Sequence, residues 1–194
     1  MNALTTDTIA ALATAPGKSG ICVVRVSGPG AASIATSILT FTPTPRTAHL
    51  SQFKDACDET IDEGIALFFK GPASFTGEDV LELQGHGGLS VQKLILDRVL
   101  SLGARLANPG EFSERAFLNN KIDLVQAEAI ADLIDANSAQ AARSALRTLS
   151  GEFSNKVNHL VAGLTKIRVN IEAAIDFSDE DIDIITESRV KEGL

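Results

Sequence analysis

The hydrophobic pattern of the chain changes character near residue 112. Before this point, short apolar runs alternate in places with polar residues and are bounded by Gly, Pro or Asp, which is typical of strands. These runs are 8–13, 21–26, 65–69 and 80–83. Two helices are predicted between them, at 29–39 and 89–102, the second closed by a glycine. The first part of the chain is therefore predicted to be an α+β unit in which strands and helices are mixed.

After residue 112 only helical spacing remains, so the second part is predicted to be all α. Asp123, with Gln126 three residues later, is typical of a capping box at the start of a helix that runs to about residue 136. Asn137 or Ser138 can cap the next helix. An apolar stripe that recurs every three or four residues then predicts one long helix from Leu146 to Ile175, about 45 Å at 1.5 Å per residue.

The composition excludes several classes of protein. A net charge of -8 and an aromatic content of 5% argue against a chain that holds a polynucleotide by itself, because that binding relies on Lys, Arg and stacked rings. Cys22 and Cys57 lie far apart, so they neither build a disulfide framework nor supply a zinc site, and no metal site is predicted. Reduced cysteines, no signal sequence and no apolar run long enough to span a bilayer predict a cytoplasmic protein without membrane contact.

Two short motifs raise the question of nucleotide binding. The segment 14–20, TAPGKSG, contains the Gly-Lys-Ser with which phosphate-binding loops end, and 120–123, NKID, matches the motif that reads guanine in GTPases. A phosphate-binding loop needs a glycine where this chain has Leu12, and a helix where it has a strand-like run. No Asp-x-x-Gly occurs in the sequence. Neither motif is therefore interpreted as a nucleotide site: the first is a hairpin turn and the second the approach to a helix.

Two charges on the predicted strands indicate a candidate binding site. Arg25 lies between valines in the run 21–26, and Glu82 alternates with Leu81 and Leu83, so each charge points to one face of a sheet. Exposure at a sheet edge explains each charge singly and is the default interpretation. The occurrence of both in one small sheet makes a polar pocket the alternative.

The remaining polar residues give no catalytic constellation. His86 could act as a base or a ligand, but no Cys/His cluster supports a metal and no Ser or Cys offers itself as a partnered nucleophile. A structural role for His86 in a turn is favoured, and no catalytic residue is predicted in this chain. The segment 108–121, which joins the two parts, has more charged and amide groups than a simple linker needs.

Longer stretches carry more specific information than these short motifs. They are Asp7–Ala10, Ala15–Gly17, Val24–Gly28, Ser74–Asp79, Glu82–Gly88, Pro109–Asn119, Lys121–Ala129, and the segment from Asp132–Ala136 through Ala174–Phe177. In this order, and over essentially the whole chain, they closely resemble the start of the tRNA modification GTPase family MnmE, also called TrmE.

The resemblance implies a fold and a set of ligands. Residues 1–118 would be a folate-binding and dimerisation domain, similar to the tetrahydrofolate-binding fold of aminomethyltransferases, and residues 119–194 the first part of a helical domain. In this family a Ras-like G domain that binds GTP, Mg²⁺ and K⁺ interrupts the helical domain. The family works as a homodimer with the flavoprotein MnmG to modify the wobble uridine of tRNA, with a folate as the one-carbon source.

The resemblance also assigns the candidate site. By match to the folate-contacting positions of the family, Arg25, Glu82 and Lys121 are the expected ligands of a tetrahydrofolate derivative, formyl-tetrahydrofolate. A carboxylate can accept two adjacent N–H groups of a pterin, and the two cations can meet its carbonyl or carboxylate oxygens.

One departure from the family limits these expectations. The chain ends where the helical domain should lead into the G domain, so GTPase activity, the K⁺ site and a C-terminal lysine of the folate site are expected outside it. On its own the chain is expected to be inactive as a GTPase, and its folate pocket incomplete. The alternative function is a non-enzymatic scaffold for dimerisation and partner docking, with a vestigial pocket.

Overall fold

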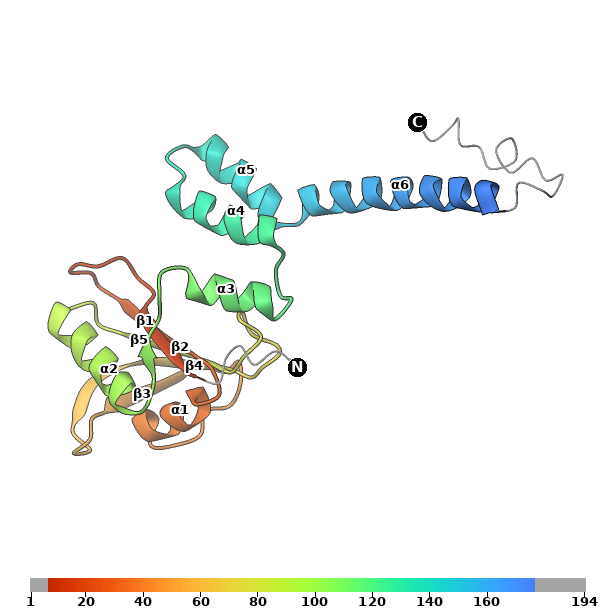
Figure 1. Cartoon of the computed structure of the whole chain (residues 1–194). Coiled ribbons are helices and arrows are strands. Elements are labelled where there is room, and N and C mark those ends of the chain that lie inside the picture. Colours follow the sequence, from red (N-terminus) through yellow and green to blue (C-terminus); the bar gives the residue numbers. More distant parts are fainter. Residues whose placement is uncertain (1–6, 177–194) are drawn as a thin grey trace. The chain divides into compact units, whose positions relative to one another are not determined.

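The structure is a computed structural model that describes residues 7–176. Its contacts divide the chain between Asp123 and Leu124 into two compact units (Figure 1). Within the described residues, a mixed sheet with helices forms the first unit and helices alone form the second, as the hydrophobic pattern predicts. The domain boundary predicted between residues 118 and 119 stays a prediction.

The sheet of the first unit has the strand order β3-β4-β5-β2-β1-β6. Neighbouring strands are antiparallel, except that β1 and β6 are parallel. The strands are β1 (Ile9–Leu12), β2 (Cys22–Ser27), β3 (His49–Lys54), β4 (Thr60–Phe69), β5 (Val80–Gly85) and β6 (Arg105–Leu106). The four predicted strands are confirmed, β4 begins earlier than predicted, and β3 and β6 were not predicted.

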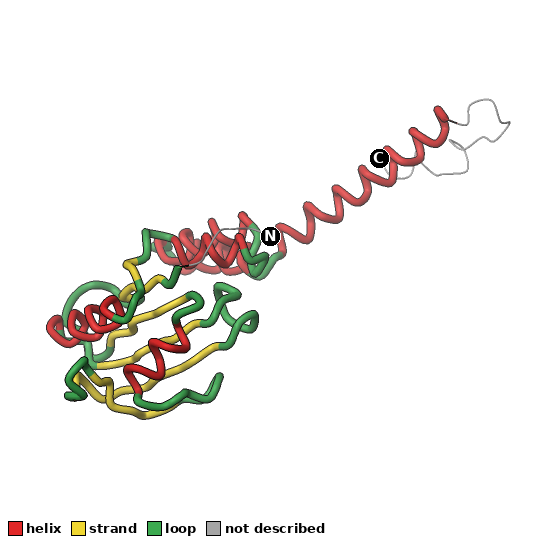
Figure 2. Tube along the Cα trace, turned by 60° about the horizontal axis from the view of Figure 1, so that its bottom comes forward, coloured by secondary structure: helices red, strands yellow, loops and turns green. Residues whose placement is uncertain are grey.

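One face of the sheet carries the hydrophobic core. Because side chains alternate along a strand, the paired residues Val24, Leu83 and Ala66 all point to this face and are fully buried. The helices α1 (Ala31–Leu39) and α2 (Leu89–Ser101), which confirm the two predicted helices, pack against it in one continuous core (Figure 2). The side chains between the buried ones, including Arg25 and Glu82, therefore lie on the opposite face.

The segment 14–20 is part of the connection between β1 and β2, which pair as an antiparallel hairpin. The Ser19 amide donates to the Gly87 carbonyl at 3.1 Å, and the Gln92 side chain donates to the Gly17 carbonyl at 2.9 Å. A side chain at Gly87 would collide with Ser19, so the backbone at Gly87 can approach this loop only as glycine. The prediction of a hairpin turn is confirmed.

The second unit consists of α4 (Leu124–Asp135), α5 (Ala139–Leu149) and α6 (Glu152–Asp176). Ser138 caps α5 by accepting from the Ala141 amide at 3.1 Å, as predicted. Small buried residues, Ala129 of α4 and Ala145 of α5, allow the two helices to pack closely. The part of the predicted helical domain that follows residue 176 lies outside the described residues.

The single helix predicted from Leu146 to Ile175 is wrong in one respect, because it is divided. Leu146 and Leu149 belong to α5, which ends there, and Gly151 has a left-handed φ of 86° before α6 begins. Glycine adopts this conformation without steric cost and commonly ends helices. The Gln126 side chain donates to the Leu149 carbonyl at 2.9 Å and so satisfies one of the groups that the helix end leaves open.

Candidate functional site

Arg25 and Glu82 face each other across β2 and β5, the two central strands of the sheet. The Arg25 Nε and Nη2 atoms donate to Glu82 Oε1 at 2.9 and 2.7 Å. The side chains are 30% and 16% exposed, so the pair is partly withdrawn from water. Edge exposure, the default interpretation of these charges, is wrong, because each charge lies at the centre of the sheet and offsets the desolvation of the other.

Two aromatic rings lie close to Arg25. Its guanidinium carbon lies 5.8 Å from the ring centroid of Phe75 and 5.8 Å from that of Phe112. This distance is within the range of cation–π attraction. Phe75 comes from the loop between β4 and β5, and Phe112 from α3 (Glu111–Leu118). Hydrophobic patterning does not single out either ring, although both lie in the stretches that carry the family resemblance.

Lys121 contacts the loop that carries Phe75 rather than the Arg25–Glu82 ion pair. Its Nζ donates to the Pro72 carbonyl at 3.0 Å, and its backbone amide donates to Ala116 at 2.8 Å, just after α3. The ammonium group is exposed. The structure thus brings two of the three predicted site residues, Arg25 and Glu82, into direct contact and holds the third against the loop that supplies Phe75.

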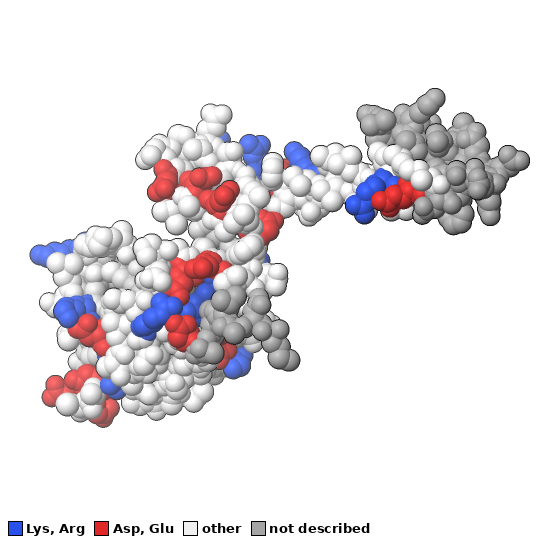
Figure 3. All heavy atoms as spheres, in the orientation of Figure 1, with Lys and Arg blue, Asp and Glu red and all other residues white. Residues whose placement is uncertain are grey.

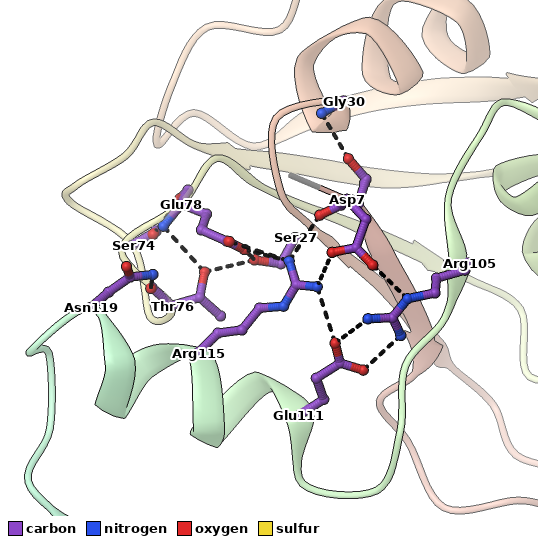
Figure 4. A network of polar contacts seen from close by, with 11 residues as sticks. Asp7, Ser27, Gly30, Ser74, Thr76, Glu78, Arg105, Glu111, Arg115 and Asn119 are labelled. Carbon is purple, nitrogen blue, oxygen red and sulfur yellow. Dashed lines mark hydrogen bonds and ion pairs between the residues drawn. The ribbon is translucent and has the colours of Figure 1, made fainter. Parts of the chain in front are cut away.

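A buried cation, Arg115 on α3, organises the polar groups beside this site (Figure 4). Arg115 is 1% exposed. Its Nη1 donates to the Asp7 carbonyl at 2.9 Å and to both carboxylate oxygens of Glu78 at 3.2 Å. Its Nη2 donates to Asp7 Oδ1 at 2.8 Å and to Glu111 Oε1 at 3.0 Å. Three carboxylates from distant parts of the first unit therefore converge on one guanidinium, which the sequence alone did not predict.

Arg105 on β6 completes the network from the other side. Its Nε donates to Asp7 Oδ2 at 2.6 Å and its two Nη atoms donate to Glu111. The Asn108 amide also donates to Glu111, at 2.8 Å. The bonds from Arg105, with those from Asn108 and Arg115, lower the pKa of Glu111 to about 2. The bonds from Arg105 and Arg115 also hold the pKa of Asp7 below its ordinary value.

The loop that carries Phe75 is fastened by its own polar residues. Ser27 of β2 donates to Glu78 Oε2 at 2.7 Å and shares a 2.7 Å hydrogen bond with Thr76. Asn119, which follows α3, donates to the Thr76 carbonyl at 2.7 Å. The loop is therefore bound both to the centre of the sheet and to the end of α3.

His86 has a defined structural partner in Asp62 of β4. The His86 amide donates to Asp62 Oδ2 at 2.7 Å, and its ring Nδ1 hydrogen-bonds Asp62 Oδ1 at 2.8 Å. Burial alone would raise the pKa of Asp62, but the bonds from His86 lower it below its ordinary value. These contacts hold the turn that follows β5.

The described residues provide neither a metal site nor a membrane-spanning helix. Among residues 7–176, no group of three or more His, Cys, Asp or Glu side chains is arranged to hold a metal ion. Within the same residues, none of the helices combines the length and apolar character that a bilayer crossing requires. The Arg25–Glu82 ion pair and the two rings near it are therefore the candidate ligand site of the first unit.

Comparison with known proteins covers both units. Residues 8–121 match the family model described as GTP-binding protein TrmE N-terminus, and residues 124–194 match the one described as MnmE helical domain. Relatives named tRNA modification GTPase MnmE are 59% identical over 189 residues in Marinobacter nauticus, 60% over 190 in Hydrogenovibrio crunogenus and 60% over 189 in Pasteurella multocida. These matches cover 97%, 98% and 97% of this chain, but 41%, 42% and 42% of the relatives.

The fold and the matches together define a two-part chain in which a mixed α/β unit with a candidate ligand site precedes a helical unit. The chain belongs to the MnmE family of tRNA modification GTPases, also called the TrmE family. It spans about two fifths of the length of the curated relatives that it matches.

Proposed function

We propose that this chain is the folate-binding and dimerising N-terminal part of a tRNA modification GTPase. The observation that supports this proposal is the Arg25–Glu82 ion pair, which lies at the centre of the sheet with the rings of Phe75 and Phe112 both close to the guanidinium. A half-buried charge pair next to two aromatic rings suits a flat, polar heterocycle, which needs stacking surfaces and in-plane hydrogen-bond partners.

The polar atoms of the site have the chemistry that a reduced folate requires. Both Arg25 bonds end on Glu82 Oε1, and within the described part of the chain no hydrogen bond ends on Glu82 Oε2. This oxygen can accept an N–H of a pterin edge, while Arg25 and Lys121 supply positive charge for carbonyl or carboxylate oxygens. A folate bound here would supply the one-carbon unit, and the three side chains would bind and orient it. The aminomethyltransferase-like fold belongs to the same proposal.

The wider activity is proposed from the family. Relatives are named tRNA modification GTPases, so the whole protein would hydrolyse GTP in a G domain that binds Mg²⁺ and K⁺. It would act as a homodimer in the cytoplasm, with the flavoprotein MnmG as its partner and the wobble uridine of tRNA as its target. This chain would contribute the folate site and the dimer contact, not the GTPase chemistry.

Titration with formyl-tetrahydrofolate, followed by calorimetry, tests the folate proposal. A full-length relative should bind, and the 194-residue chain should bind more weakly because one lysine of the expected site lies outside it. Glu82→Gln should weaken binding to either protein by about tenfold or more, because a hydrogen bond to a charged group is lost. Glu82→Ala should lose most of the affinity. The control is Glu63→Gln, which changes an exposed carboxylate on β4 and should leave affinity unchanged.

Two outcomes would count against this function. Absence of folate binding by the full-length relative would overturn the proposal. If this chain forms a dimer in sedimentation, and neither it nor the full-length relative binds folate, the result would support the scaffold alternative instead.

A further inference from the structure

The two rings close to Arg25 belong to segments that are not paired with each other by backbone hydrogen bonds. Phe75 lies on the loop 70–79, and Phe112 lies on α3. The distance between the two rings therefore depends on the side-chain contacts between the loop and α3. Within the first unit, the most deeply buried joint is the ion pair between Glu78 of the loop and Arg115 of the helix.

We propose that the Glu78–Arg115 pair sets the position of Phe75 relative to Phe112 beside Arg25, so that Glu78 and Arg115 are positioning residues for a planar ligand. This inference rests on the proposed function only for the identity of the ligand. Glu78 follows Phe75 by three residues in the loop, and Arg115 follows Phe112 by three residues in α3. Residues three apart on a helix are neighbours on its surface, so Arg115 and Phe112 move together.

Burial restricts the movement of the Glu78–Arg115 ion pair. The Arg115 side chain is 2% exposed and the Glu78 side chain 11% exposed, so neither charge can exchange its partner for water without opening the loop. Glu78 also accepts a hydrogen bond from Ser27 of the central strand β2. Ser27 lies two residues after Arg25 on this strand. The same carboxylate thus ties the loop to α3 and to the strand that carries the central cation.

The network supplies its own matched control. Glu111 is a second buried partner of Arg115, but it lies at the start of α3 and, among the described residues, has no hydrogen bond or ion pair with the loop that carries Phe75. Glu111→Gln therefore weakens the same network while leaving the loop joint intact. A purely structural role of the network predicts equal effects for Glu78→Gln and Glu111→Gln, whereas positioning predicts an effect at Phe75 from Glu78→Gln alone.

The sequence has no Trp or Tyr, so Phe75→Trp introduces a single fluorophore at the site. Phe75 is partly exposed, which leaves room for the larger ring. Acrylamide quenching of this Trp should rise by about twofold when Glu78→Gln is added, because the loop opens locally, and should stay unchanged with Glu111→Gln. Glu78→Asp keeps the charge and should fold even if Glu78→Gln does not; its shorter side chain should also raise quenching. Equal quenching in all four proteins, or an equal rise with Glu78→Gln and Glu111→Gln, would overturn the inference.

A binding readout links the joint to the ligand. In the full-length relative and in this chain, the change matching Glu78→Gln should lower formyl-tetrahydrofolate affinity about fivefold, but should have no further effect once Phe75→Ala has been introduced. Additive losses would show that Glu78 acts other than through Phe75 and would contradict the inference. If wild-type proteins bind no folate, the proposed function fails, while the quenching comparison still decides whether Glu78 and Arg115 position the ring.

Discussion

The two units of the chain differ in which charged and apolar side chains they bury. In the first unit, a charged side chain, Arg115, is among the most buried groups, and apolar residues such as Leu83 fill a closed core. In the second unit, α6 exposes its apolar stripe, with Leu160 62% and Leu164 55% exposed. The view in Figure 3 shows basic and acidic side chains next to one another on the first unit, whereas the charges of α6 include the exposed pair Arg168–Glu172. The first unit thus contains its own stabilising contacts, whereas α6 draws little stability from tertiary packing.

Identical substitutions in the two units should therefore have very different costs. Leu83 is fully buried and belongs to β5, which lies between β2 and β4. Leu83→Ala should therefore lower the free energy of unfolding of the first unit by about 2–5 kcal/mol. Leu164→Ala removes a side chain that is mostly in water already and should change stability by less than about 0.5 kcal/mol. Urea unfolding followed by fluorescence of a Phe75→Trp background reports the first unit, and far-UV circular dichroism reports the helices.

A large loss of stability with Leu164→Ala would contradict this difference between the units, because it would mean that α6 is packed against something in solution. The concentration dependence of that cost would then distinguish a second copy of the chain from a contact within one copy.

Acid should act on the first unit through its buried carboxylates. The pKa of Glu111 is about 2 in the folded state, against an ordinary value of 4.5. Because the folded pKa is the lower one, the stabilisation is complete above about pH 4.5 and is lost as the pH falls towards 2, by up to about 3 kcal/mol. Urea titrations of the Phe75→Trp protein between these pH values measure the loss.

The control for this pH dependence is Glu111→Gln, which removes the titrating group. It should be less stable at neutral pH and should show a shallower loss of stability in acid. An unchanged slope would mean that Glu111 does not carry the dependence, and Asp7, whose pKa is also lowered by both arginines, would be the next group to replace.

The sequence predicted the elements with strong periodicity and missed those whose order depends on distant partners. Alternation identified β2 and β5, but not β3, where Phe53 is the single fully buried residue, nor β6, which has two residues. Arg25 and Glu82 were identified as strand charges, yet their pairing follows from strand order and register, which no local pattern contains. Arg115 looks like an ordinary helix surface charge, since its partner Asp7 lies 108 residues away in the chain.

The smallest expected changes in stability concern the break between α5 and α6. At this break the sequence pattern and the structure disagree. Gly151 has a φ of 86°, a conformation that costs residues with a side chain about 1 kcal/mol or more, so Gly151→Ala should destabilise the second unit by about that amount. Gly163 lies inside α6 with open space around it, so Gly163→Ala should stabilise α6 by about 0.5–1 kcal/mol. Thermal unfolding by far-UV circular dichroism measures both. If one helix ran from Leu146 to Ile175, as the stripe predicts, both substitutions would stabilise it; opposite signs require the break at Gly151.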